Sequence, residues 1–281
     1  MRLVVGVLAV LLLAAGCSTG DNGTELAAST SGDGYRSPVW LGDTVYYLAV
    51  DSGGAAGLMR AGPGRAPEAV PFANCRAEWL VPAGENRIGV VVDCGGRNHR
   101  LVTVDAGGAT ADPPAPLDYT GEGATWDAVA FTGYTWQGGC GLRSFPGSEG
   151  PCFGGPDARY PVIGPDRRVL YLDTRCGTDE PARRGTYAVC RHDSAGETTL
   201  ARGVATPAGL DARGGRIAVA GTVDGDAGLW LLDAGRFTRV ATGDFRGVAL
   251  SPDGRRAAAP LRDEGWLSTR WSLRVVGLPL S

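Results

Sequence analysis

Residues Ala249–Ala259 read Ala-Leu-Ser-Pro-Asp-Gly-Arg-Arg-Ala-Ala-Ala, and this stretch decides the fold. The pattern predicts a strand, a tight turn and a second strand. Pro252 fixes φ at the value that the second position of a turn needs, Asp253 accepts local backbone hydrogen bonds, and Gly254 can adopt a positive φ. We therefore expect an antiparallel hairpin that turns at Pro252, Asp253 and Gly254.

Weaker versions of this strand–turn–strand unit recur upstream, giving six units between residues 35 and 281. One turn residue from each unit is Gly42, Gly84, Gly133, Pro165, Gly214 and Gly254. Their mean spacing of about 42 residues matches four-stranded propeller blades, which repeat at about 40–45 residues. One such unit cannot cover both faces of its small sheet, whereas units stacked around a ring cover each other.

The sequence therefore predicts an all-β fold, a six-bladed β-propeller with four-stranded antiparallel blades, over residues 35–281. The third unit is the least regular, because it has the flanking strands but no Pro-Asp turn. A β-sandwich, which also contains many short strands, is the alternative. The even spacing of one turn type favours the propeller.

Two of the turns resemble the WD-like repeat of TolB-type β-propellers. They are Ser-Pro-Asp-Gly-Arg-Arg at 251–256 and Gly-Pro-Asp-Arg-Arg at 164–168. The resemblance covers roughly residues 35–281. It implies that each repeat builds the two inner strands of a blade and that the blades surround a central channel. TolB has a further N-terminal domain and is not lipidated, so its partners are not transferred to this chain.

The first 16 residues are predicted to be a lipoprotein signal peptide. Arg2 precedes an apolar run, Leu3–Leu13, that is too short for a bilayer span of about 20 residues. The run ends in Leu-Ala-Ala-Gly-Cys, which resembles a bacterial lipobox and implies lipidation of Cys17; an ordinary cleaved secretion signal is the alternative. Residues 17–34, rich in Ser, Thr, Gly and Asp, are expected to form a flexible lipidated tether.

These segments predict an extracytoplasmic protein anchored to the outer face of the bacterial cell membrane. The formal net charge is −3, so no basic face for nucleic acid is indicated. The expected partners are the membrane, through the lipid anchor, and an envelope protein or glycan whose identity the sequence does not specify. We expect a monomer, with no nucleic acid and no cofactor.

Six cysteines remain after Cys17, and outside the cytoplasm an even number indicates disulfides. Six cysteines allow 15 connectivities. We favour pairing in sequence order, because each bridge then closes a short segment within or between neighbouring blades: Cys75–Cys94, Cys140–Cys152 and Cys176–Cys190. A metal site is not indicated, because the sequence has no Cys-x-x-Cys and its two histidines are isolated.

No set of residues in the sequence forms a coherent catalytic group. His99 and His192 are expected on the surface, since a general base needs a partner within hydrogen-bond reach. The residues Asp224-Gly225-Asp226 are read as a solvated hairpin, with a Ca²⁺ site as the alternative. Most of the tryptophans are expected to pack between blades.

The candidate binding residues are Tyr134, Trp136 and Arg143, in a Gly- and aromatic-rich insertion of the third unit. Insertions in repeat proteins often lie on the binding face, so we expect a ligand at the channel mouth near them. The predicted function is a binding or scaffold module of the envelope, with no catalytic residue assigned. The alternative is a glycan-active hydrolase or lyase, which would need two acidic side chains converging at the channel; a sensor of envelope state is a third possibility.

Overall fold

The computed structural model describes twelve segments of the chain. They are residues 23–30, 34–71, 75–83, 86–94, 99–106, 110–111, 124–126, 131–134, 142–145, 152–164, 168–266 and 268–279. Every regular element in these segments is a β-strand, and all strand pairs are antiparallel, as the sequence predicted. Nothing in them forms a helix long and apolar enough to cross a membrane.

Three four-stranded sheets follow one another, each with its strands in chain order. The first contains β2 (Gly34–Leu41), β3 (Thr44–Val50), β4 (Ala56–Gly62) and β5 (Arg65–Ala69). The second contains β6 (Arg76–Pro82), β7 (Arg87–Asp93), β8 (His99–Asp105) and β9 (Thr110–Ala111). The third contains β10 (Ala124–Trp126), β11 (Phe131–Tyr134), β12 (Leu142–Phe145) and β13 (Cys152–Phe153). The irregular third unit thus still folds as one sheet.

A seven-stranded sheet comes next. It contains β14 (Arg159–Ile163), β15 (Val169–Asp173), β16 (Tyr187–Asp193), β17 (Gly196–Arg213), β18 (Arg216–Val223), β19 (Asp226–Asp233) and β20 (Arg236–Thr242). The first half of β17 pairs with β16, its second half pairs with β18, and the register shifts between Ala205 and Gly209. One long strand therefore serves two consecutive groups of four strands.

The last sheet joins the two ends of the described chain. It contains β21 (Asp244–Phe245), β22 (Ala249–Leu250), β23 (Arg256–Glu264), β24 (Thr269–Gly277) and β1 (Thr24–Ser29). β1 pairs with β24, placing Thr24 opposite Val275 and Ser29 opposite Trp271. The closure links residues about 245 positions apart, with Glu25 lying 2.9 Å from both Arg270 and Arg274.

This closure corrects part of the predicted tether. Residues 17–34 were assigned to a flexible segment by composition, but Thr24–Ser29 within it is a strand. The composition is misleading because β1 is the outermost strand of its sheet and needs little apolar surface: Ala27 is its one buried residue. Its stability comes from backbone pairing and from the Glu25 ion pairs rather than from a hydrophobic pattern.

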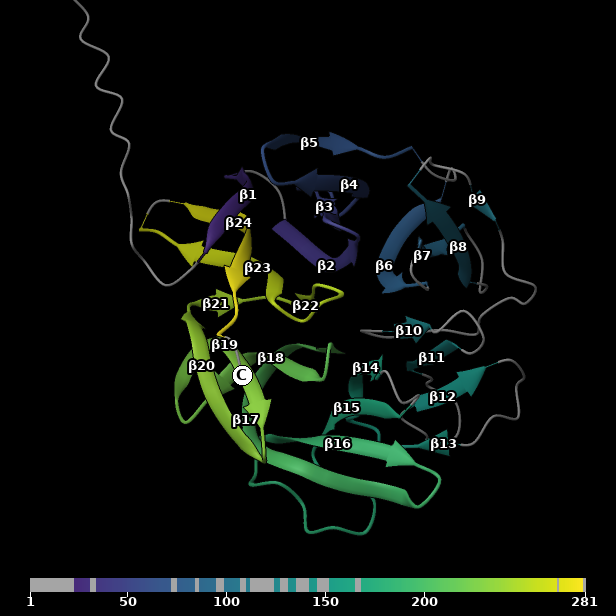
Figure 1. Cartoon of the computed structure of the whole chain (residues 1–281), viewed down its shortest axis with the longest axis vertical. Helices are drawn as coiled ribbons and strands as arrows, with labels where there is room; N and C mark the ends of the chain where they lie inside the picture. Colours follow the sequence, from purple (N-terminus) through teal and green to yellow (C-terminus); the bar gives the residue numbers. More distant parts are fainter. Residues whose placement is uncertain are drawn as a thin grey trace, which may run out of the picture.

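The sheets are arranged around a common centre, with their first strands innermost (Figure 1). These strands contact one another in succession: β2 with β6, β6 with β10, β10 with β14, β14 with β17, β17 with β22, and β22 with β2. The hydrophobic core lies between neighbouring sheets. One cluster joins Tyr46 and Leu48 of the first sheet to Ile88 and Val90 of the second. This radial stacking is the arrangement of a β-propeller.

The stretch from which the sequence analysis started folds as predicted. β22 and β23 flank a turn in which Gly254 N donates to Ser251 O, and Gly254 has a φ of 66°. The Asp253 carboxylate accepts the Arg255 N–H at 3.0 Å. Gly254 packs on the turn of the preceding unit, because a Cβ there would lie 3.0 Å from Arg213 O. In each unit we call the turn between the first two strands the first-hairpin turn. The side of the molecule that carries these turns is the turn face.

Two of the three predicted disulfides are confirmed. Cys75 bonds to Cys94, and Cys176 bonds to Cys190. Cys140 and Cys17 lie outside the described residues, so the pairing of Cys140 with Cys152 stays a prediction. Because disulfides persist in oxidising compartments, the two bonds indicate an extracytoplasmic protein.

Candidate functional site

Three of the innermost strands contain the same distortion. In β2, β14 and β17 the register shifts at an X-Pro pair, where the residue before proline has a positive φ: Ser37 at 50°, Tyr160 at 52° and Thr206 at 42°. Positive φ is uncommon for residues other than glycine, and such strained positions and β-bulges concentrate near functional sites. We call the end of the central axis with these bulges the mouth; it lies opposite the turn face.

A cavity of about 60 Å³ runs along the axis. It is lined by parts of β2, β6, β14, β17 and β22, together with residues that directly precede β22. A buried water needs only about 10–15 Å³, whereas drug-sized ligands occupy pockets of about 300–1,000 Å³. The axis therefore has room for a few waters, and a larger ligand would have to lie across the mouth.

Aromatic and hydroxyl groups gather among the residues lining this cavity. The rings of Trp79 in β6 and Tyr160 in β14 lie 6.3 Å apart at an interplanar angle of 37°. These strands are not neighbours, since β10 lies between them in the ring of contacts. Ser37 lines the same cavity, and its buried Oγ has no hydrogen-bond partner in the described structure. An unpaired buried hydroxyl is available to a ligand.

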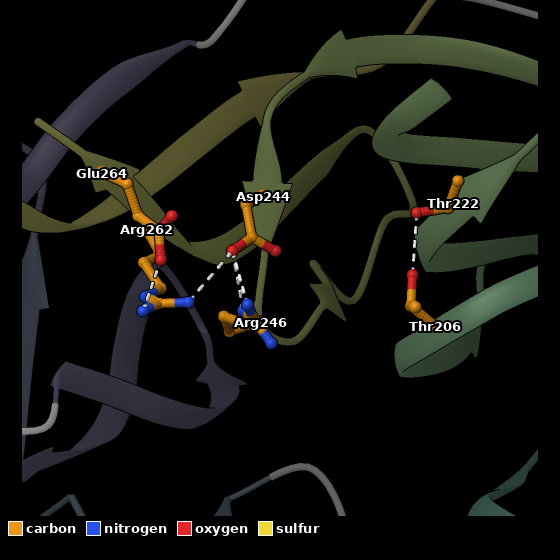
Figure 2. A network of polar contacts seen from close by, with 6 residues as sticks. All are labelled: Thr206, Thr222, Asp244, Arg246, Arg262 and Glu264. Carbon is orange, nitrogen blue, oxygen red and sulfur yellow. Dashed lines mark hydrogen bonds and ion pairs between the residues drawn. The ribbon is translucent and has the colours of Figure 1, made fainter. Parts of the chain in front are cut away.

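Arg246 adds a fixed positive charge to the cavity lining. Its Nε and Nη2 lie 3.0 and 2.6 Å from Asp244 Oδ2, and its backbone N–H donates to Pro260 O. Asp244 lies 3.9 Å from Arg262, which also pairs with Glu264 at 2.5 Å (Figure 2). The Arg246 side chain is 43% exposed, so its guanidinium is oriented by Asp244 but remains accessible.

Thr206 lies at the bulge of β17, and unlike Ser37 its hydroxyl has a hydrogen-bond partner. Its hydroxyl lies 2.8 Å from the hydroxyl of Thr222 on β18 (Figure 2). This bond ties the bulge of β17 to the neighbouring strand. The bulge of β17 is therefore internally supported.

The one carboxylate that lines the axial cavity, among the described residues, belongs to Asp211. Burial raises the pKa of this carboxyl group, while Arg213 and two backbone N–H donors partly oppose that shift. Oδ1 accepts the Ala212 N–H at 2.8 Å and Oδ2 accepts the Leu250 N–H at 2.6 Å. Both oxygens are thus engaged in holding backbone, and Asp211 is a structural residue rather than a free acid or base.

The described structure covers the predicted binding residues only in part. Tyr134 and Arg143 occur in β11 and β12, the second and third strands of their sheet, and Trp136 lies outside the described residues. Their role as a binding site stays a prediction.

The other polar motifs have local explanations. His192 is half-buried and its ring stacks on Phe153 with the centroids 4.3 Å apart. Asp224 and Asp226 form an exposed hairpin turn in which Asp226 pairs with Arg239 at 2.9 Å. Among the residues with a described position, no group of three or more His, Cys, Asp or Glu is placed to hold a metal.

The residues at the mouth belong neither to the repeated turn pattern nor to the insertion from which the site was predicted. A usable signal was present: Ser37-Pro38, Tyr160-Pro161 and Thr206-Pro207 each precede an apolar inner strand. A residue before proline is restricted in conformation, and a proline within a strand indicates an edge or a bulge. Repetition of this pair ahead of three units could have predicted the bulges.

Comparisons with known proteins agree with this fold. The chain is similar to an aldose sugar dehydrogenase from Streptomyces coelicolor, solved with bound PQQ, at 12% identity and a TM-score of 0.57, covering 90% of this chain and 97% of that one. It is also similar to a putative gluconolactonase at 13% identity and a TM-score of 0.54, covering 92% and 94%. Both are propeller-like enzymes, and at these identities the likeness concerns the fold alone.

A further similar structure is puromycin hydrolase, at 16% identity and a TM-score of 0.48. The chain spans about half of that protein, 51% of its length. No protein-family profile and no curated protein matches the sequence. The fold and the disulfides together define the chain as an extracytoplasmic β-propeller.

Proposed function

We propose that this protein is a six-bladed β-propeller, anchored to the outer face of the bacterial membrane, that binds a ligand at the mouth of its axis. The number of blades is supported by the succession of contacts among β2, β6, β10, β14, β17 and β22. It is also supported by β17, whose two halves divide the seven-stranded sheet into two groups of four. The proposed propeller includes β1 and so begins before residue 35.

The proposed anchor is the lipidated Cys17 that follows a cleaved signal peptide at residues 1–16. Because β1 begins at Thr24 beside Val275, the chain enters the propeller on the turn face. Only a few residues separate Cys17 from this strand, and six residues span at most about 20 Å when fully extended. The turn face would then lie close to the membrane, and the mouth would point away from it.

The proposed ligand is an acidic glycan of the envelope. Trp79 and Tyr160 offer ring faces on which a sugar can stack, and such aromatic side chains with arginine dominate many binding sites. Arg246 would pair with a carboxylate, and the Ser37 hydroxyl would accept or donate a hydrogen bond. The observation that carries this proposal is the convergence of the aromatic pair, Arg246 and the unpaired Ser37 hydroxyl on one cavity lining.

The experiment is a binding screen of purified protein against envelope glycan fragments with and without a carboxylate. Trp79→Ala and Arg246→Gln should each weaken binding by about tenfold or more. The matched controls are Trp266→Ala, whose side chain is 97% exposed, and Arg236→Gln at the exposed start of β20. Equal loss in the control variants, or no preference for acidic fragments, would overturn the proposal.

The second candidate is a glycan-active hydrolase or lyase. The names of the similar structures favour this reading over a purely structural scaffold, because those proteins are enzymes. The described lining of the axial cavity contains a single carboxylate, Asp211, whereas glycosidases use a pair. Incubation of the bound fragments with the protein, followed by chromatography of the products, decides between the two: turnover identifies an enzyme, and intact fragments identify a binding module.

A further inference from the structure

A ligand-sized space lies away from the axis, between the two halves of the seven-stranded sheet. We call it the arginine groove; its volume is about 570 Å³, within the range of about 300–1,000 Å³ that suits small-molecule sites. Three arginines line it, Arg168, Arg191 and Arg216. The rest of the lining is largely apolar and comprises Gly164, Leu170, Leu200, Ala212, Gly215 and Ile217.

The charges in the groove are unevenly paired. Asp193 lies 3.3 Å from the Nε of Arg191 and 3.8 Å from the Nε of Arg168. Arg216 has no carboxylate within ion-pair distance among the described residues, and its buried Nη1 lacks a hydrogen-bond partner there. Buried N–H groups are nearly always hydrogen-bonded in native proteins, so Arg216 provides an unfilled position for an anion.

The groove lies on the turn face. Gly164 and Arg168 flank the turn between β14 and β15, Gly215 belongs to the turn between β17 and β18, and Arg216 directly follows that turn. The other described charges in or beside the first-hairpin turns are also mainly positive: Arg87, Arg213, Arg255 and Arg256, against Asp43 and Asp253. Among the described residues, arginines therefore outnumber carboxylates at these turns, on the face where the N-terminal segment enters.

We propose that the arginine groove binds the headgroup of an anionic phospholipid. Arg216, with Arg168 and Arg191, would contact the phosphate, since guanidinium groups match phosphate oxygens in geometry and charge. Leu200 and Ile217 would contact the first methylenes of the acyl chains. A lipid is the indicated source of the phosphate because the lining is apolar and because the segment carrying Cys17 departs from this same face. The choice of a lipid over a free phosphate rests in part on the proposed membrane anchorage.

Calorimetry with soluble short-chain lipids tests the proposal. The protein is produced from Ser18 onward, which retains every described strand and removes both the apolar signal and Cys17. Dihexanoyl-phosphatidylglycerol should bind at least about tenfold more tightly than dihexanoyl-phosphatidylcholine, which has no net charge, and than glycerol phosphate, which has no acyl chain. Equal affinity for phosphatidylcholine would overturn the role of charge, and equal affinity for glycerol phosphate would overturn the lipid.

Variants test the assignment of Arg216. Arg216→Gln should weaken phosphatidylglycerol binding at least about tenfold, and Arg216→Lys should lose less because it keeps the charge. Arg65→Gln, at the exposed start of β5 in the first sheet, is the matched control and should bind normally. If Arg216→Gln does not fold, Leu200→Gln replaces it and should weaken binding of the lipid but not of glycerol phosphate. Unchanged binding in the folded variant overturns the proposal, and because Cys17 is absent, this result is independent of lipidation.

Discussion

The carboxylate of Asp211 accepts a 2.6 Å hydrogen bond from the backbone N–H of Leu250, across the junction between β17 and β22. β22 contains two residues, so few ladder hydrogen bonds hold it. On its other side the Ala249 carbonyl accepts a 2.9 Å bond from Trp40 Nε1 of β2. Side chains from both neighbouring sheets therefore fix the strand at which the structure closes.

Replacement of Asp211 tests this junction. Asp211→Ala leaves the N–H groups of Leu250 and Ala212 unsatisfied, and each unsatisfied buried group costs about 1–3 kcal/mol. Asp211→Asn should cost less, because the amide oxygen can still accept one of the two bonds. The measurement is the free energy of unfolding in urea. A variant with alanine that is as stable as the variant with asparagine would contradict the assignment.

Comparison of the wild type with Asp211→Asn also predicts a pH dependence of stability. Because burial raises the pKa of Asp211 in the folded state, the folded protein holds the proton to higher pH than the unfolded chain. The contribution of Asp211 to stability is therefore greatest below the unfolded pKa of about 3.9 and decreases as the pH rises through the folded pKa. The stability advantage of the wild type over Asp211→Asn should shrink as the pH rises. A constant or growing advantage would contradict the prediction.

Trp40→Phe should lower the free energy of unfolding by about 1–3 kcal/mol, because it leaves the buried Ala249 carbonyl without its donor. The substitution also removes the larger ring over which Arg256 lies at 4.8 Å. Trp266→Phe is the matched control, since Trp266 is 97% exposed and should change stability by less than about 0.5 kcal/mol. Urea unfolding followed by circular dichroism measures both.

Gly209 lies where β17 closely approaches the segment that precedes β22. A Cβ at this position would lie 3.0 Å from the Gly247 Cα and the Val248 N of the neighbouring unit. Gly209→Ala should therefore destabilise the protein by about 1–3 kcal/mol through overpacking. Gly277→Ala is the control, because nothing lies within 4 Å of a Cβ built there. Equal effects of the two substitutions would show that backbone entropy, not the close approach, determines the result.

The two disulfides should differ in their sensitivity to reductant. Cys176 and Cys190 are 1% and 0% exposed, whereas Cys75 is half-buried and Cys94 is exposed. Because thiol–disulfide exchange requires access to a sulfur, Cys75–Cys94 should be reduced first. Removal of Cys176–Cys190 by paired Cys→Ala substitution should cost about 3 kcal/mol in the chain-entropy view of a loop of about 15 residues. Alkylation under graded reductant, followed by mass spectrometry, gives the order of reduction.

Removal of β1 tests the closure of the last sheet. A chain starting at Ser31 lacks the strand that pairs with β24 and the Glu25 ion pairs. We expect its melting temperature to fall by at least about 4 °C relative to a chain starting at Gly23, and we expect the exposed edge of β24 to promote association. Calorimetry and light scattering measure the two effects. Identical melting of both chains would mean that β1 contributes nothing to closure.

The turn chemistry of residues 249–259 and its repetition were enough to predict an all-β fold with radial sheets. Turns such as Ser-Pro-Asp-Gly depend on the φ preferences of adjacent residues, and those preferences are local. The pairings Cys75–Cys94 and Cys176–Cys190 were also predictable, because each joins neighbouring segments. The sequence by itself therefore determined the repeated unit and its local bridges.

Tertiary structure decided what depends on distant residues. Thr24–Ser29 has the composition of a linker and becomes a strand because β24 offers it an unpaired edge. In the sequence Asp211 is an ordinary strand residue. Its role depends on the Leu250 N–H, which β22 places against its carboxylate. The Nη1 of Arg216 is buried without a hydrogen-bond partner in the described structure, at a groove lined by two halves of one sheet. Closure, burial of charge and the position of the groove follow from packing between units, which a local sequence pattern does not encode.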